Sequence, residues 1–335
     1  SEPIRSRKHA EVFQRLLRDI SLNCLVEEIG VKLDLSEPDS KASQALASAP
    51  VVFDFTASVG ASRDVSDCTN RGRAISAFFN PSGNAFVVLV EGNERNCDLS
   101  NLEAEYYANV AQMDHLADHL SDPNRIVVSS GQCRSVSNRL SSSDSALLSA
   151  AATKAIKTAL DDPAASITIG TIVQDGSLEI NHFEVVSGSS EIYIDGWTIR
   201  MAGNVDSRLR NARDVALPNE TGGVLLGIVD HKRKRIEIAL TLPPPTDSAC
   251  APNEFLRGVH DLRRSIDQVS NRVMHQLTYV GEWHSHPKGA TSLPSSIDQV
   301  QLNDLANDLS SESRPAVMVV VAERESRICA RERQQ

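Results

Sequence analysis

Two histidines one residue apart, His284 and His286, stand shortly before Ser295 and Asp298 in this chain. The run LTYVGEWHSH predicts a strand, and residues i and i+2 of a strand point to the same face, so the two imidazoles project together. Pro294 and the serines after it predict a helix start, with Asp298 in the first turn. Two imidazoles and one carboxylate are the protein ligands of a catalytic zinc that keeps a fourth position for water. A His-x-His pair alone is more often a polar strand edge, so the zinc hypothesis depends on what else the chain supplies.

The composition of the chain indicates the class of protein in which these residues occur. With 335 residues, 41% of them hydrophobic and 23% charged, the chain is typical of soluble globular proteins, and its length favours two domains. The longest apolar runs, such as PAVMVVVA, are too short to cross a bilayer, and SEPIRSRKHAEVFQRLLRDI has no apolar signal-peptide core. Six scattered cysteines without CxxC spacing fit reduced thiols. We therefore expect a cytoplasmic protein that does not enter a membrane.

Charge is distributed unevenly and argues against two classes of partner. Before Glu191 the chain has 16 Lys and Arg against 25 Asp and Glu, and from Glu191 onward 18 against 19. An acidic first part is a poor surface for nucleic acid or for an anionic membrane. The basic run HKRKR at 231–235 lies between two strand-like runs, which predicts a solvated hairpin turn rather than a nucleic-acid patch.

The order of predicted elements places a domain boundary near 188. Residues 1–188 alternate helices and strands, which favours an α/β layer. Residues 189–335 predict an α+β unit with a mixed sheet and flanking helices. The first part has predicted helices over 8–20, 41–49, 102–120 and 145–160, strands over 25–33 and 50–56 (the latter buried), and hairpins over 76–90 and 167–186. The second part has a predicted strand over 191–201, a helix over 205–213, two strands, a long helix over 253–273, the histidine strand, the Asp298 helix and two closing strands.

A further carboxylate precedes the histidines, Glu220 in ETGGVLLG. Glu220, then HSHP, then Ser-Ser-x-Asp resembles the JAMM signature of the JAB/MPN family of zinc isopeptidases and peptidases, in its bacterial branch and over roughly 190–335. The loop from the second histidine to Ser295 is one residue longer than is usual in that family. The resemblance implies zinc held by His284, His286 and Asp298, with Glu220 taking a proton from water and passing it to the leaving amine. It implies that Ser295 donates to the oxyanion of the tetrahedral intermediate. The plainer alternatives are a surface carboxylate for Glu220 and a helix N-cap for Ser295.

Other candidate residues are weaker. Glu282 shares the strand face of the two histidines and is a candidate to orient them without binding the metal itself. Trp283 points the other way and is expected in the core. His115 and His119 have the i,i+4 spacing of a helical metal pair, but without a third ligand we expect an exposed helix face. Arg257 suggests no specific role.

The first part has a looser resemblance, to the later half of the ThiF/MoeB-like adenylation fold of ubiquitin-activating enzymes. PVVFDFTASVGASRD and AISAFFNPSGNAFVVLVEG carry it. The chain has no Gly-x-Gly-x-x-Gly after an N-terminal strand, and Ala57 stands where the family has a magnesium-binding Asp. Cys68 and Cys133 lack a neighbouring acid–base residue that would activate a thioester cysteine. We therefore expect a partial, non-catalytic domain that docks substrate or partner.

These resemblances together predict a zinc-dependent isopeptidase or peptidase that removes or matures a ubiquitin-like modifier. The expected partners are the C-terminal tail of such a protein, its conjugates and other components of a bacterial ubiquitin-like conjugation system. Two alternatives stay open, an adenylating enzyme whose nucleotide-binding half lies outside this chain and a metal-free MPN scaffold.

Overall fold

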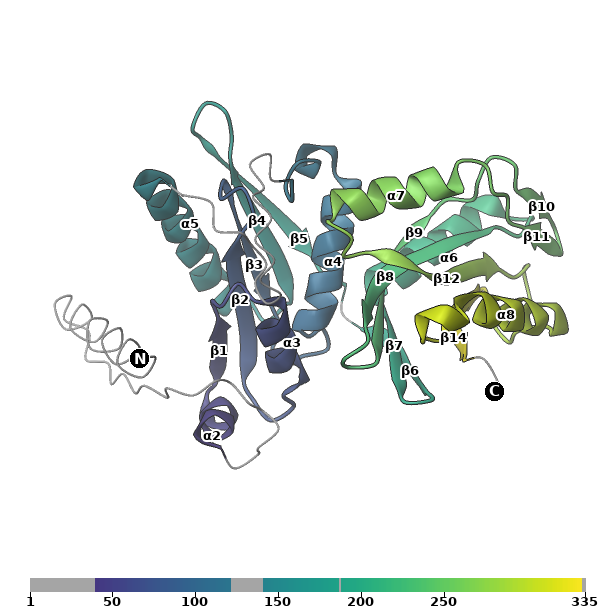
Figure 1. Cartoon of the computed structure of the whole chain (residues 1–335), viewed down its shortest axis with the longest axis horizontal. Coiled ribbons are helices and arrows are strands. Elements are labelled where there is room, and N and C mark those ends of the chain that lie inside the picture. Colours follow the sequence, from purple (N-terminus) through teal and green to yellow (C-terminus); the bar gives the residue numbers. More distant parts are fainter. Residues whose placement is uncertain (1–39, 122–140, 187, 333–335) are drawn as a thin grey trace.

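The computed structural model describes residues 40–121, 141–186 and 188–332, which form two sheets and a small hairpin. The helix predicted over 8–20, the strand predicted over 25–33 and Cys133 lie outside the described residues. The two sheets stand side by side, and helices lie between them and on their outer faces (Figure 1). This arrangement confirms the expected class, an α/β region followed by a mixed sheet with flanking helices.

The first sheet has the strand order β1-β2-β3-β4-β5, with β1 parallel to β2 and the other neighbours antiparallel. The hairpins predicted over 76–90 and 167–186 are confirmed. The strands are β1 (Val51–Asp54), β2 (Arg73–Phe79), β3 (Ala85–Val90), β4 (Ser166–Ile172) and β5 (Leu178–Glu184). The helices are α2 (Lys41–Ser48), α3 (Val59–Asp67), α4 (Leu99–Gln112) and α5 (Ser142–Leu160), with a 3₁₀ turn at Asp114–Leu116.

Both faces of the first sheet are covered, which explains the continuous apolar run AFVVLV of β3. Phe86 and Val88 pack toward Leu148 of α5 on one face. Val87 and Leu89 belong to the core under α3 and α4 on the other face.

The second sheet has the order β14-β13-β12-β8-β9-β7-β6 and is mixed, since β12 runs parallel to β13 and β7 parallel to β9. Helix α6 covers one face, and α4, α7 and α8 cover the other. The strands are β6 (Ser189–Ile194), β7 (Trp197–Ala202), β8 (Gly222–Asp230), β9 (Arg235–Leu242), β12 (Thr278–Ser285), β13 (Ala316–Val321) and β14 (Ser326–Arg331). The helices are α6 (Gly203–Ala216), α7 (Leu262–Arg272) and α8 (Ser296–Asp308), with a 3₁₀ turn at Leu309–Glu312. The separate hairpin pairs β10 (Ala249–Ala251) with β11 (Glu254–Leu256).

Helix α4 lies between the two sheets and belongs to both (Figure 1). Every residue of α4 except Gln112 is buried. Its apolar side chains share one core cluster with Val87 of the first sheet and with Ile228 and Leu240 of the second. Buried charges join the same layer, because Arg63 of α3 pairs with Glu103 of α4 at 2.8 Å and with Asp230 of β8 at 3.1 Å.

The long helix predicted over 253–273 is wrong in its first half. Residues Glu254–Leu256 form strand β11, and helix α7 begins only at Leu262. Asp261 has the left-handed φ of 54°, which no helix interior accommodates, so the helix cannot extend back through it.

The prediction of an exposed helical histidine pair is also wrong. Helix α4 ends at Gln112, because Met113 takes an extended conformation. The chain then folds back, so that His119 is buried with its Nε2 3.0 Å from the Tyr106 hydroxyl, while His115 is exposed.

Two smaller expectations also need correction. The strand predicted as buried over 50–56 is the edge strand β1, whose Phe53 is 45% exposed, since the described chain places a neighbour on one side only. Residues 231–234 form the predicted turn, but its Arg233 is not solvated. Arg233 pairs with Asp230, Asp64 and Asp67, because the carboxylates of α3 face the turn.

No helix in the described ranges combines the length and apolarity needed to cross a membrane.

Candidate metal centre

The two histidines lie at the carboxyl end of β12, in the middle of the second sheet. β12 is paired on both sides, with β13 and with β8. His284 is the Cα partner of Gly222 at the start of β8, so Glu220, two residues earlier, reaches the same end of the sheet. The backbone N–H of His286 donates to the Val321 carbonyl of β13 at 2.8 Å, which extends the pairing one residue past the strand.

The side chains of His284, His286 and Asp298 bring their ligand atoms together at distances that suit zinc. His284 Nε2 lies 3.3 Å from His286 Nε2 and 3.1 Å from Asp298 Oδ1, and His286 Nε2 lies 3.5 Å from Asp298 Oδ2. Tetrahedral ligands that bind zinc at about 2.0–2.1 Å lie roughly 3.4 Å from one another. Among the described residues, this cluster of histidine and acidic side chains is the one that meets the requirements of a metal site. The donor set therefore fits zinc.

The environment of His286 prepares its Nε2 to bind a metal. Its Nδ1 lies 2.6 Å from the Thr291 carbonyl, a pure acceptor, so Nδ1 carries the proton and donates it. The Nε2 lone pair is then free for a cation, the arrangement that outer-shell carbonyls commonly impose on metal-binding histidines. Arg213 of α6 donates its Nε–H to the His286 carbonyl at 3.0 Å and fixes the backbone there.

Asp298 is held by the first turn of α8, as its position in the sequence predicts. Ser295 is the N-cap, and its Oγ accepts the Asp298 N–H at 3.2 Å, while the Ser295 N–H donates to Asp298 Oδ2 at 2.6 Å. This capping box fixes the carboxylate against the two histidines. Burial favours the neutral acid, but the His284 and His286 imidazoles beside the carboxylate outweigh it and hold the pKa of Asp298 well below its usual range.

Glu220 is a mostly buried carboxylate beside the ligands, 8% exposed. Its backbone N–H donates to the Ala251 carbonyl of β10 at 2.8 Å. Burial raises the pKa of Glu220 above the ordinary value of a glutamate, and the neighbouring His284 and His286 oppose this rise. A raised pKa suits a group that must both accept and release a proton near neutral pH.

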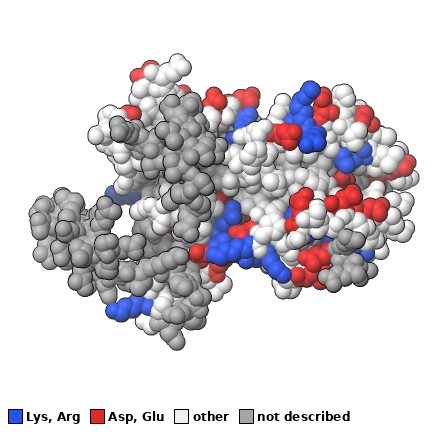
Figure 2. Space-filling view, viewed as in Figure 1, with Lys and Arg blue, Asp and Glu red and all other residues white. Residues whose placement is uncertain are grey.

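Glu220, Ser295 and the three candidate ligands line one groove of about 650 Å³. The β11 strand forms one wall with Leu256 and α8 the other with Ile297, and both side chains are more than half exposed. The groove also carries the carboxylates of Glu254, Asp304 and Asp308. Acidic side chains gather at the end of the molecule that holds α8, on the right of Figure 2.

The structure also places the weaker candidates. Trp283 is 2% exposed, which confirms the prediction that it belongs to the core. Glu282 lines the groove on the side of the histidines, and its partners are Arg257 and Tyr279. Cys68 lies at the end of α3 beside the first sheet, and its sulfur is 3.8 Å from the Asn70 carbonyl.

Two residues that shape the centre were not predicted. Thr291 fixes the His286 proton through a backbone carbonyl, so no property of its side chain marks it in the sequence. Arg213 lies 73 residues before His286, at the end of the helix predicted over 205–213, and it is 2% exposed. A sequence pattern signals neither contact, because both depend on the folding of distant segments.

A match to a known protein family covers the part of the chain that holds these residues. Residues 204–333 match the family described as prokaryotic homologs of the JAB domain. The chain is 33% identical over 103 residues to a curated protein of Enterobacter hormaechei subsp. hoffmannii (strain UCI 50) named CD-NTase/cGAS isopeptidase, a match that covers 31% of this chain and 55% of that protein. This chain therefore spans about half the length of its curated relative. A solution structure of a protein from Desulfitobacterium hafniense aligns with 40% of this chain and 90% of its own, at 17% identity and a TM-score of 0.28.

Proposed function

We propose that the JAB-like part of this chain, residues 189–335, is a zinc-dependent isopeptidase or peptidase that acts on a ubiquitin-like modifier. The observation that carries the proposal is the convergence of three zinc-compatible ligand atoms and a buried glutamate in one groove. The match to prokaryotic JAB homologs and the isopeptidase name of the curated relative support a hydrolase of amide bonds.

His284, His286 and Asp298 would hold the zinc. Zinc held there would make a bound water acidic enough to supply hydroxide near neutral pH, and would polarise a carbonyl oxygen. Glu220 accepts the proton that water gives up and delivers it to the nitrogen of the amine that leaves. Its carboxylate returns to the charged form with each turnover, so the residue acts as base and then as acid.

Ser295 would stabilise the oxygen of the tetrahedral intermediate. Its hydroxyl already accepts the Asp298 N–H, which leaves the hydroxyl proton available for donation into the groove. Capping and catalysis therefore use different parts of one hydroxyl group. Ser295 lines the groove, although the loop before it is longer than is usual in the family that the sequence resembles.

The shape of the groove favours an extended substrate segment. A flexible tail with small residues brings its backbone close to a metal, and a neighbouring strand edge such as that of β11 offers main-chain hydrogen bonds to it. The C-terminal tail of a ubiquitin-like protein, attached to a target amine, has these properties. Conjugates of a CD-NTase, the protein class in the name of the curated relative, are the first substrates to test.

We propose a supporting role for residues 1–188, as a partial adenylation-like domain that docks the modifier or another component of a bacterial conjugation system. This role rests on the sequence resemblance and on the shared core that fixes the first sheet beside the second. The four described cysteines are free thiols, which suits action in the reducing cytoplasm.

The decisive experiment combines metal content with turnover. Native mass spectrometry should find one zinc per chain in the wild type and none, or a weakly held one, in His284→Ala. Glu220→Gln should keep the zinc but lose turnover of a modifier conjugate, because the amide cannot accept a proton. His260→Ala, which removes a histidine outside the groove, is the matched control and should change neither.

Two results of that experiment would contradict the proposal. A wild-type protein without zinc under metal-replete conditions would indicate the metal-free scaffold. Full cleavage by Glu220→Gln would place the base elsewhere, with Glu282 the next candidate in the groove.

A further inference from the structure

Residues 243–261 connect β9 to α7 and carry the β10–β11 hairpin over the groove. Two contacts bring this hairpin to the start of β8. The Ala251 carbonyl accepts the Glu220 N–H at 2.8 Å. The Phe255 ring lies over Gly222, so closely that a Cβ there would be 2.4 Å from a ring carbon. The hairpin therefore sets the backbone position of the proposed base.

A third contact ties the hairpin to the histidine strand. Arg257, the residue after β11, places its Nε 3.0 Å and its Nη2 2.9 Å from Glu282 Oε1. The Tyr279 hydroxyl donates to the same oxygen at 3.2 Å. Glu282 lies in β12 two residues before His284, so this pair joins the hairpin to the strand that presents the candidate ligands.

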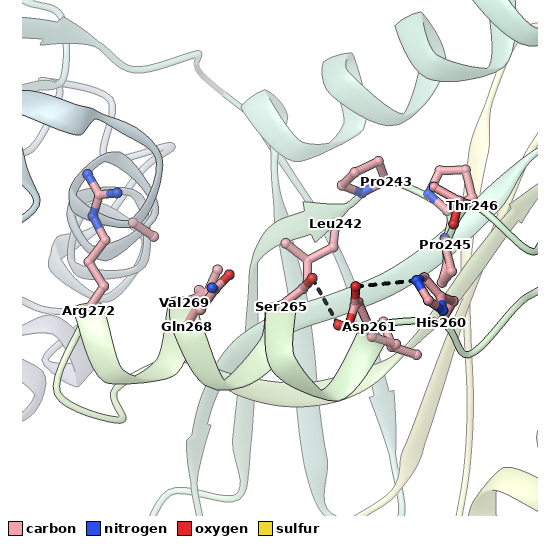
Figure 3. Close-up of a pocket in the computed structure, with 13 residues that line it drawn as sticks. Leu242, Pro243, Pro245, Thr246, His260, Asp261, Ser265, Gln268, Val269 and Arg272 are labelled. Carbon is pink, nitrogen blue, oxygen red and sulfur yellow. Dashed lines mark hydrogen bonds and ion pairs between the residues drawn. The ribbon is translucent and has the colours of Figure 1, made fainter.

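The root of the segment, where residues 247 and 248 meet residues 258–260, has no comparable contact with the sheet. Asp247 accepts the N–H groups of Val259 and His260, each at 3.0 Å, and Ser248 Oγ accepts the Gly258 N–H at 2.9 Å, so these bonds close the segment on itself. On its other side the root borders a cavity of about 420 Å³, lined by residues 243–246 and by α7 along its length, from Leu262 to Arg272 (Figure 3). The root is therefore not packed against a core that would fix the hairpin.

We infer that the Arg257–Glu282 ion pair is a latch that holds the β10–β11 hairpin in register over the groove, and that both are positioning residues for Glu220. This inference rests on the proposed function for its catalytic meaning. Opening the latch frees the hairpin, and with it the Ala251 carbonyl that orients the Glu220 backbone. Both side chains are about one quarter exposed. The ion pair is therefore shielded enough from solvent to stabilise the hairpin, and exposed enough for its hydrogen bonds to break.

Hydrogen exchange of the zinc-free protein tests the latch without any activity. Arg257→Gln and Glu282→Gln should each speed exchange of the amides in 249–256 by about three- to ten-fold, the range for a partly exposed charge-assisted hydrogen bond. The double variant should exchange no faster than either single variant, because one interaction is lost in all three. Arg263→Gln is the matched control, since the Arg263 side chain is 96% exposed on the neighbouring helix. Unchanged exchange in 249–256, or multiplying effects in the double variant, would overturn the latch.

Turnover tests the link to Glu220. The two single variants should retain one zinc and lower kcat by a similar factor with a smaller change in KM, since a displaced base slows the chemistry. Arg257→Lys should recover most of kcat, because an ammonium group also reaches the Glu282 carboxylate. Faster exchange with unaltered kcat would overturn the positioning role. If the wild type cleaves no conjugate, the proposed function fails, and the exchange experiment still decides the latch.

Discussion

Acid should destabilise this protein through a buried histidine far from the metal centre. His119 is 6% exposed, and its Nε2 lies 3.0 Å from the Tyr106 hydroxyl. Burial lowers the pKa of His119 from 6.5 to about 4, because the apolar surroundings disfavour the imidazolium. In the unfolded chain His119 is not buried, so it takes up a proton near pH 6.5.

The direction of the change in stability with pH depends on whether the folded or the unfolded state binds the proton. Between pH 6.5 and 4 the unfolded chain is protonated at this histidine and the folded protein is not, so proton binding favours unfolding. The stability is fully present above pH 6.5 and is lost as the pH falls toward 4. At pH 5 the two pKa values correspond to a loss of about 2 kcal/mol relative to pH 8.

Urea unfolding of the wild type and of His119→Gln at pH 8 and pH 5 measures this loss. The variant should be less stable at pH 8, because the new side chain packs less well around Tyr106. Its fall in unfolding free energy between pH 8 and pH 5 should nevertheless be smaller than that of the wild type by about 2 kcal/mol. An equal fall in both proteins would refute the reasoning, because every other titrating group is common to them.

Three further outcomes concern the site and the first sheet. Ser295→Gly should change the free energy of unfolding by no more than about 0.5 kcal/mol, since glycine caps helices nearly as well as serine. The same variant should lower kcat by roughly 10²–10³ if the hydroxyl stabilises the oxyanion. A loss of stability with normal kcat would show that Ser295 is a helix cap alone. A folded modifier with a C-terminal extension should have a higher kcat/KM than a peptide of the tail sequence, and equal values would indicate a general peptidase. The chain should show no ATP–pyrophosphate exchange, because Ala57 stands at the expected magnesium position; measurable exchange would revive the adenylating alternative.

The positions of the three candidate ligands could be predicted because their placement is local. His284 and His286 need only the two-residue period of a strand, and Asp298 needs only the first turn of a capped helix. Glu220 was a different case. It comes 64 residues before His284, and its own segment has no feature that predicts a base, so only the family resemblance made it a candidate.

The rest depends on contacts between distant segments. Arg257 is 25 residues from Glu282, and strand β11 just before it lies within the segment that was predicted as a helix. The pattern around 253–273 favoured a helix, but pairing between β10 and β11 outweighed the local preference. His119 was misjudged for the same reason, because its burial depends on a break after Gln112 and on Tyr106.

Helix α4, buried between the two sheets, has a consequence for how the molecule melts. Neither sheet can lose its order without exposing the helix that also completes the other, and the Arg63 ion pairs would be broken at the same time. Heating should therefore give one calorimetric transition, whose van't Hoff and calorimetric enthalpies agree, rather than two. A nick between residues 188 and 189 should leave the two pieces bound to each other, since the cut crosses the backbone but not the core. Any force or partner that turns the first sheet would then turn the groove with it as one rigid body.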